Sequence, residues 1–370
     1  YVTETESKDL IYGALKGMMG SLDSHSQFMD PDAYNELKVE TTGKFGGLGI
    51  EITIKDGLLT IITPLEDTPA WKVGLKSGDR IVKIEDEVTR DYTLMDAVKR
   101  LRGKPGTDVN ITVLREDAGK LLNFKITRAI IKIKDVKEAK ILEDRIGYIR
   151  LVEFRENTGK SIEKALSDLE KQEADSLILD LRNNPGGLLD AAVKVTNSFI
   201  EADKIIVSTK GRKEFQNIVF RSNSKNPNID WPIVVLVNEG SASGSEIVAG
   251  ALQDYKRAVI LGVKTFGKGS VQTVIPLSDG SALRLTTSEY FTPSEKNING
   301  IGITPDVEVK QQIVELKEAQ GIEEIFEEIE EGKVPNEEEV SKPDYNSDYQ
   351  LVRAIDLLKG IRIYNQQETE

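Results

Sequence analysis

The segment with the clearest capacity for chemistry is residues 232–247, where an aliphatic run is followed by very small residues and then by a helical pattern. Ser243 lies where the helix would begin, so a tight turn there would expose its hydroxyl as a nucleophile. The amide of Gly244, at the positive end of that helix, would then face a developing oxyanion. The same residues fit a capping box made by Ser243 and Glu246. Local sequence alone favours the cap without excluding the nucleophile.

A serine nucleophile needs a neighbouring base, and the composition restricts which residue can act. The chain has no cysteine and one histidine, His25, in a polar stretch typical of an ordinary surface or capping residue. Cysteine nucleophiles and Cys/His zinc sites are therefore excluded, and we expect no metal and no cofactor. Lys268 is the favoured base, because its small and apolar neighbours would depress its pKa. Gln272 could hold the amine; the alternative is a surface lysine in a glycine-rich turn.

A second glycine-rich segment, residues 180–187, follows an aliphatic strand and precedes a helical pattern. Ligand sites of α/β proteins gather at such strand ends. Gly186 or Gly187 could therefore supply a second amide to the oxyanion. By itself, however, Asn-Pro-Gly-Gly is equally an ordinary turn before a helix.

A third glycine-rich segment begins at Phe45 and leads into a strand. With a helix predicted at residues 93–101, it suggests a groove in which a peptide could add as an extra strand. The carboxylate of that peptide would be held by residues at the start of the strand. We expect these tail-binding residues to be Gly47, Leu48, Gly49 and Ile50.

Residues 262–268 also nearly match a phosphate-binding loop of nucleotide hydrolases. The match fails at Gly269, where a Ser or Thr would contact magnesium, and no clear long helix follows. Nucleotide hydrolysis is therefore disfavoured.

The elements that must position these residues belong to a chain of 370 residues, enough for two or three domains. Its composition, 39% apolar and 30% charged, is that of a globular protein, and no stretch is long and apolar enough for a membrane span. The net charge of −13 argues against nucleic-acid binding, which relies on clustered Lys and Arg.

The periodicity changes three times along the chain. A helix is predicted at residues 8–19, short strands and turns follow, and strands then alternate with helices, which indicates an α/β core with a mixed sheet. An acidic run at 321–340 precedes a last helix at 349–361. The predicted division is a helical segment at 1–40, a mostly-β domain at 41–130, an α/β core at 131–310 and an acidic, helical segment at 311–370, which packs on the core or forms an interface.

Together these motifs resemble the C-terminal processing peptidases, or tail-specific proteases, which are serine peptidases with an inserted PDZ domain. The likeness covers residues 10–309, and each motif alone would be weak, whereas the ordered set is specific. The motifs are GMMGSLDSHS at 17–26, GGLGI at 46–50, LKSGDRI at 75–81, DLRNNPGG at 180–187, GSASGSEI at 240–247 and TFGKGSVQ at 265–272.

The resemblance assigns the catalytic roles to residues already singled out. It implies that Ser243 is the nucleophile, Lys268 its base and Gln272 the support of the base. The oxyanion donors would be the amides of Gly244 and Gly187. Three further residues match positions that support the site: Glu246, Asp254 and Thr265. The mostly-β domain would be the PDZ domain.

The implied function is a serine endopeptidase that recognises the C-terminal tails of protein substrates through its PDZ domain and processes or degrades them. Expected partners are proteins with accessible apolar C-termini and further copies of the chain in a homo-oligomer, with an adaptor protein as another candidate. The implied location is the periplasm or another extracytoplasmic compartment, after signal peptide removal. The alternatives are a non-catalytic PDZ-type binding protein and a protease that rests until a tail or an adaptor binds.

Overall fold

The computed structural model describes residues 1–55, 57–115, 120–223, 230–311 and 348–367. The chain forms two compact units, which are described separately: Tyr1–Tyr34 with Asp135–Glu370, and Asn35–Lys134. The acidic run predicted at 321–340, and with it most of the predicted segment at 311–370, lies outside the described residues. The four-part division of the chain stays a prediction.

The core of the larger unit is a six-stranded sheet in the order β10-β11-β12-β15-β16-β19. These strands are β10 (Val136–Ile141), β11 (Ile146–Leu151), β12 (Ser176–Asp180), β15 (Ile233–Val237), β16 (Val259–Gly262) and β19 (Val307–Glu308). β10 is antiparallel to β11 and all other pairs are parallel. Every residue of β12 and β15 is buried, as is typical of parallel strands covered on both faces. The predicted α/β core with a mixed sheet is confirmed.

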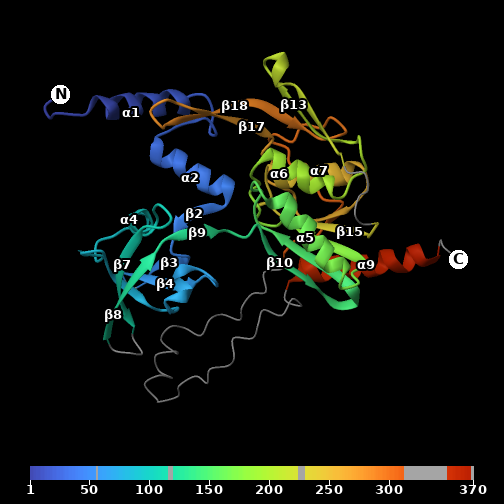
Figure 1. The fold of residues 1–370 in the computed structure, drawn as a ribbon. Coiled ribbons are helices and arrows are strands. Elements are labelled where there is room, and N and C mark those ends of the chain that lie inside the picture. Colours follow the sequence, from blue (N-terminus) through green and yellow to red (C-terminus); the bar gives the residue numbers. More distant parts are fainter. Residues whose placement is uncertain (56, 116–119, 224–229, 312–347, 368–370) are drawn as a thin grey trace, which may run out of the picture. The chain divides into compact units, whose positions relative to one another are not determined.

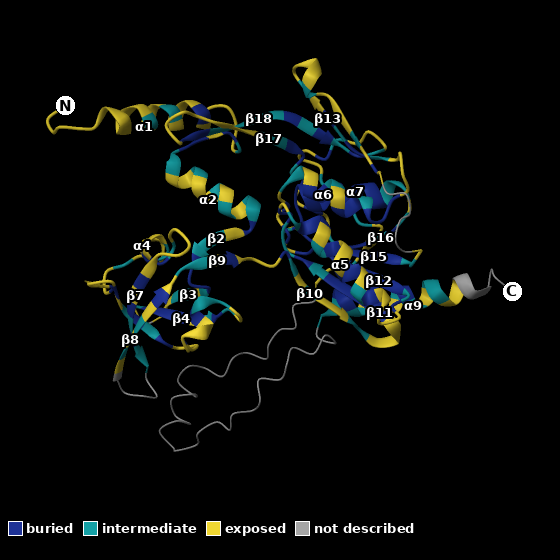
Figure 2. Ribbon diagram, viewed as in Figure 1, coloured by how far each residue is buried: buried dark blue, intermediate teal, exposed yellow. Residues whose placement is uncertain are grey.

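Helices cover both faces of this sheet (Figure 1). They are α5 (Thr158–Glu170), α6 (Leu189–Asn197) and α7 (Gly244–Asp254) on one face and α9 (Tyr349–Gln367) on the other. Leu177 and Leu179 of β12 pack into the apolar core under α5, α6 and α7, whereas Ile178 packs against Leu351 and Ile355 of α9. The dark blue strands between these helices in Figure 2 are therefore buried by two separate apolar layers.

A second sheet of the same unit lies in the order β1-β18-β13-β14, with β17 paired to β18. Its strands are β1 (Gln27–Met29), β13 (Ile205–Gly211), β14 (Ile218–Arg221), β17 (Ser270–Pro276) and β18 (Ala282–Phe291). The predicted helix at 8–19 is confirmed as α1 (Ser7–Gly20), and two short 3-10 helices occupy Glu143–Arg145 and Glu214–Gln216. β17 begins two residues after Lys268, so this sheet fixes one end of the loop that carries the predicted base.

Helix α2 (Pro31–Thr42) carries the chain into the smaller unit, which is mostly antiparallel β-structure. Its elements are β2 (Lys44–Gly47), β3 (Ile50–Lys55), β4 (Leu58–Pro64), α3 (Pro69–Lys72), β5 (Arg80–Ile84), β6 (Glu87–Val88), α4 (Leu94–Leu101), β7 (Asp108–Arg115), β8 (Lys120–Thr127) and β9 (Ala129–Lys132). β3 is an edge strand of the main sheet of this unit. A capping box of Thr93 and Asp96 begins α4, which confirms the predicted helix.

Candidate active site

The nucleophile turn, residues 238–243, joins the end of β15 to the start of α7. Ser243 is buried and has φ 50° and ψ −108°, a backbone conformation that non-glycine residues rarely adopt. Such strain persists only where neighbours enforce it. Here the Ser241 hydroxyl donates to the carbonyl of Leu181 (2.8 Å) and the Ala242 amide to the carbonyl of Asn184 (3.0 Å). The turn is thus held by the segment that follows β12.

Glu246 joins the nucleophile turn to the loop of the predicted base. Its fully buried carboxylate accepts four hydrogen bonds: from the amides of Ser243 (2.8 Å), Gly267 (2.7 Å) and Lys268 (2.9 Å), and from the hydroxyl of Thr265 (2.5 Å). One half of the predicted capping box is therefore formed by Glu246 and the Ser243 amide. The amide of Glu246 donates to the Ser243 carbonyl (2.9 Å), which leaves the serine hydroxyl outside the cap.

Lys268 lies half-buried in the loop between β16 and β17, residues 263–269, which we call the base loop after its predicted role. Burial, and after it the positive charge of Arg284, lower the pKa of the Lys268 amine. Both causes disfavour the charged form, as a catalytic base requires. Among the described residues no hydrogen bond joins the Lys268 amine to the Ser243 hydroxyl, so only the backbones of the pair are linked, through Glu246. A strand and not a helix follows Lys268, which agrees with the rejection of a phosphate-binding loop.

Tyr290 of β18 is a neighbour of Ser243 that sequence reasoning missed. It is buried, and burial raises the pKa of its phenol to about 12, although a hydrogen bond with the Ser243 side chain acts in the opposite direction. The phenol is therefore neutral at physiological pH. Its backbone amide donates to the Gly269 carbonyl (2.7 Å), next to the base loop. No local sequence signal marks Tyr290, because it reaches the site only through the pairing of β17 with β18.

The two predicted oxyanion donors lie on adjoining turns. We call residues 182–187 the oxyanion turn. A Cβ on Gly186, which has φ 98°, would lie 2.7 Å from the Gly244 amide nitrogen and 2.7 Å from the Ser243 Cβ, so only glycine allows this approach. The Gly186 amide already donates to the Asn184 side chain (2.9 Å). Within the described ranges the amides of Gly187 and Gly244 have no acceptor, as their predicted role as oxyanion donors requires.

Two of the predicted supporting residues, Gln272 and Asp254, make no hydrogen bond to Ser243 or Lys268 among the described residues. The side-chain amide of Gln272 donates to Ser270 (2.8 Å to the hydroxyl), and no hydrogen bond to Lys268 occurs among the described residues. Asp254 is the last residue of α7, about 16 Å along the helix from Ser243 at 1.5 Å per residue. Their catalytic roles stay predictions.

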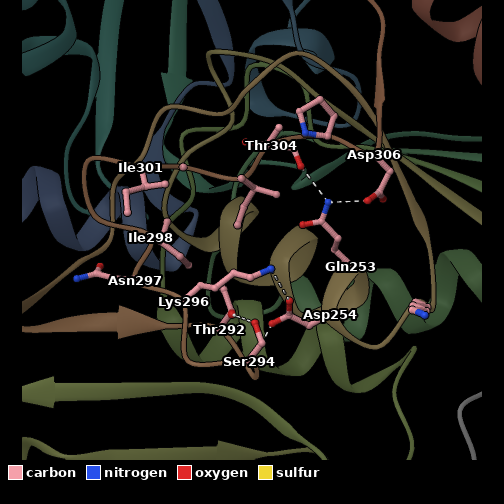
Figure 3. A pocket seen from close by; sticks show the side chains of 14 residues that line it. Gln253, Asp254, Thr292, Ser294, Lys296, Asn297, Ile298, Ile301, Thr304 and Asp306 are labelled. Atoms are coloured by element: carbon pink, nitrogen blue, oxygen red, sulfur yellow. Dashed lines mark hydrogen bonds and ion pairs between the residues drawn. The ribbon is translucent and has the colours of Figure 1, made fainter.

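Figure 3 shows that Asp254 points into a pocket of about 780 Å³, toward Thr292, Ser294 and Lys296. Burial acts to raise the pKa of Asp254, but hydrogen bonds from Thr292 and Ser294 and the charge of Lys296 lower it overall. The Ser294 amide donates to the Asp254 carboxylate (2.9 Å). Asp254 thus supports the end of α7 and the segment after β18.

The predicted tail-binding residues lie within the smaller unit, at the start of its edge strand β3. Gly49 has φ 80°, and a Cβ there would lie 2.3 Å from the Thr68 side chain. The carbonyls of Leu48 and Gly49 accept from Ala70 (2.9 Å) and Leu65 (2.8 Å), which fixes the segment before Ile50. α4 contacts β3, as the groove expected from the sequence requires.

In the part of the chain that the structure describes, no helix is long and apolar enough to cross a membrane.

Comparison with known proteins gives a match for the α/β core and a match for the mostly-β domain. The model of peptidase family S41 matches residues 145–309, and that of the PDZ domain matches residues 46–126. A carboxy-terminal-processing protease of Bartonella bacilliformis is 48% identical over 85% of this chain and 73% of its own length, and a carboxyl-terminal-processing protease of Picosynechococcus sp. is 38% identical over 83% and 75%. The solved structure of a photosystem II D1 C-terminal processing protease is 31% identical, with 84% of each chain covered and a TM-score of 0.50. The chain therefore belongs to peptidase family S41 and carries a PDZ domain.

Proposed function

We propose that the protein is a C-terminal processing serine endopeptidase in which Ser243 and Lys268 form a catalytic dyad. The observation that carries the proposal is the Glu246 carboxylate, which binds the backbone of both residues at 2.8 and 2.9 Å. A surface lysine in a loose glycine-rich turn would not require such a buried connection. The relatives named above, which are carboxyl-terminal-processing proteases, support the class of reaction.

In the proposed reaction the Ser243 Oγ attacks the scissile carbonyl while the neutral Lys268 amine takes the hydroxyl proton. The carbonyl oxygen becomes an oxyanion, which accepts hydrogen bonds from the amides of Gly244 and Gly187. Collapse of this intermediate breaks the C–N bond, and the Lys268 ammonium returns its proton to the leaving amine. Water, activated by the same amine, then attacks the ester and releases the new C-terminus and the Ser243 hydroxyl.

Substrate recognition is proposed to occur at the PDZ domain. The edge strand β3 offers unpaired backbone groups to an extended peptide, and the side chains of Ile50 and Leu94 are partly exposed where strand and helix border the groove. A protein tail with apolar residues at its C-terminus fits such a groove. An extracytoplasmic location remains part of this proposal, since it follows from the family resemblance alone.

One observation favours a protease that stays inactive until a substrate tail or an adaptor binds. The Ser243 side chain interacts with Tyr290, and in the described residues it has no hydrogen bond to Lys268. Substrate binding would then have to bring the hydroxyl and the amine together. A non-catalytic binding protein is less well supported, because it would not need the lowered pKa of Lys268.

The test is cleavage of an unfolded protein with an apolar C-terminus, analysed by mass spectrometry. Wild type is compared with Ser243→Ala, Lys268→Ala and the matched control Lys264→Ala, which alters an exposed lysine of the same loop. We expect cleavage by wild type and the control, and none by the two dyad variants. Activity that survives in Lys268→Ala would refute the dyad. Tail binding without cleavage in all four proteins, even with tail peptide added in excess, would favour the binding protein.

A further inference from the structure

A buried ion network joins the C-terminal helix to the strand that leads into the oxyanion turn. The Arg182 guanidinium donates through Nε and Nη2 to Asp180 (2.9 and 2.6 Å) and through Nη1 and Nη2 to Asp348 (2.8 and 2.7 Å). Nη1 also donates to Gln350 Oε1 (3.2 Å). All five guanidinium N–H groups are thereby used. Two of the three acceptors, Asp348 and Gln350, come from the C-terminal end of the chain.

The partners of Arg182 are themselves fixed. Asp180 is fully buried and accepts from the Tyr148 hydroxyl (2.8 Å), while the Gln350 amide donates to the Val309 carbonyl (2.8 Å). Burial acts to raise the pKa of Asp348, but the Arg182 guanidinium lowers it overall, so this carboxylate is ionised. The Asp348 carboxylate also accepts from the Leu351 amide (3.2 Å) at the start of α9. A buried guanidinium is thus shared by two carboxylates from distant parts of the sequence.

The same arginine begins the oxyanion turn. Two residues later, Asn184 accepts from the Gly186 amide (2.9 Å) through its side chain, and its carbonyl accepts from the Ala242 amide (3.0 Å) and the Ser245 hydroxyl (2.9 Å). Hydrogen bonds from Asp348 to Arg182, the covalent backbone from Arg182 to Asn184, and hydrogen bonds from Ala242 and Ser245 to Asn184 therefore connect Asp348 to the residues on both sides of Ser243.

We propose that Asp348 is a positioning residue of the peptidase: it holds the Arg182 guanidinium, and thereby the start of the oxyanion turn, so that the residue preceding helix α9, and not the packing of the helix along the sheet, is part of the active-site scaffold. Without Asp348, two N–H groups of Arg182 lose their charged acceptor in the protein interior, which is costly. The guanidinium would turn toward water and displace its own backbone. A displacement of about 1 Å at the site is enough to lower the rate about a hundredfold. The kinetic part rests on the proposed function.

The test compares Asp348→Asn with three other variants in the full chain. Asp348→Glu keeps the charge. Asp356→Asn removes an exposed carboxylate of the same helix, which pairs only with Arg353 (3.2 Å) among the described residues. Leu358→Ala loosens the packing of α9 on the sheet, about 15 Å from Asp348 along the helix, and controls for lost stability. Each protein is assayed for kcat and KM with a quenched fluorescent peptide, and for amide hydrogen exchange in peptides covering residues 182–190.

We expect Asp348→Asn to lower kcat at least tenfold with KM within about twofold, and to speed exchange in the oxyanion turn. Asp348→Glu should regain most of the kcat, while Asp356→Asn and Leu358→Ala should keep it. The proposal is overturned if kcat per folded molecule and exchange in residues 182–190 match wild type, or if Leu358→Ala lowers kcat equally. If wild type cleaves nothing, the proposed function fails, and exchange in the turn alone decides: faster exchange in Asp348→Asn supports the positioning role, and unchanged exchange overturns it.

Discussion

Replacing Glu246 by glutamine is expected to leave the protein folded and to remove most of its activity. The carboxylate faces four donors: Oε1 accepts from Thr265 and Gly267, and Oε2 from Ser243 and Lys268. Glutamine has one acceptor oxygen and one NH2 group. If NH2 takes the place of Oε2, two backbone amides lose their acceptor. If it takes the place of Oε1, the Thr265 hydroxyl can rotate and accept, so among the three backbone donors only the Gly267 amide is left unpaired.

The second arrangement, with NH2 in place of Oε1, lowers the free energy of unfolding less than the first. One buried amide without an acceptor costs about 1–3 kcal/mol. The two bonds that remain on the oxygen change from charged to neutral acceptors, a loss of about 1 kcal/mol each. The total of about 3–5 kcal/mol is below the usual stability of a domain, about 5–15 kcal/mol, so the variant should fold. Glu246→Ala, which leaves all four donors without an acceptor, should not.

Activity should suffer more than stability, because the neutral amide holds the nucleophile turn and the base loop less firmly. We expect kcat to fall about a hundredfold, the effect of a displacement of about 1 Å. The assay combines urea unfolding with steady-state kinetics at a temperature where the variant is folded. Glu163→Gln, an exposed glutamate of α5, is the control. A Glu246→Gln protein with wild-type kcat and stability would refute the positioning role of the carboxylate.

Three further predictions concern neighbours of the nucleophile and the base. Because the proposed base Lys268 must be neutral to accept a proton, kcat/KM should rise with pH through its lowered pKa. Arg284→Gln removes a positive charge, which should raise that pKa and move the acidic limb of the pH profile to higher pH; an unmoved limb would contradict this. Gly186→Ala should abolish cleavage, since its Cβ would lie 2.7 Å from the Ser243 Cβ, and normal turnover would show that the turns can separate. Tyr290→Phe removes the phenol that engages Ser243; if that contact holds the resting state, basal cleavage should increase, whereas an unchanged basal rate would argue against such a role.

The sequence was sufficient to predict the residues that belong to continuous motifs. Ser243 and Lys268 were recognisable because small residues surround each of them, and Glu246 because it lies one helical turn after the serine. Tyr290 and Asp348 could not be found in this way. Tyr290 approaches the serine only through the pairing of β18 with its neighbours, and Asp348 meets Arg182 across 166 positions. Neither contact leaves a periodic or local trace in the sequence.

The same distinction holds for the fold. The buried strands β12 and β15 were predictable from their aliphatic runs, and α4 and α7 from their caps and apolar spacing. Helix α2 was not predicted: it has no buried residue, so apolar periodicity could not reveal it. The long hairpin of β17 and β18 was also missed, because most of its residues are only partly buried and lack a strict alternation.

The parallel sheet explains why three loops distant in sequence form one site. Asp180 of β12 is in register with Leu236 of β15, and Val237 of β15 with Gly262 of β16, so the three strands end at the same level. The oxyanion turn, the nucleophile turn and the base loop leave from these ends, and neighbouring parallel strands are about 5 Å apart. Strand register alone, however, brings the three loops only close enough for side chains to connect them. The final adjustment requires Asn184 between the first two loops and Glu246 between the last two, and for this reason conservative substitutions at these buried residues, such as Glu246→Gln, should affect the rate before they affect the fold.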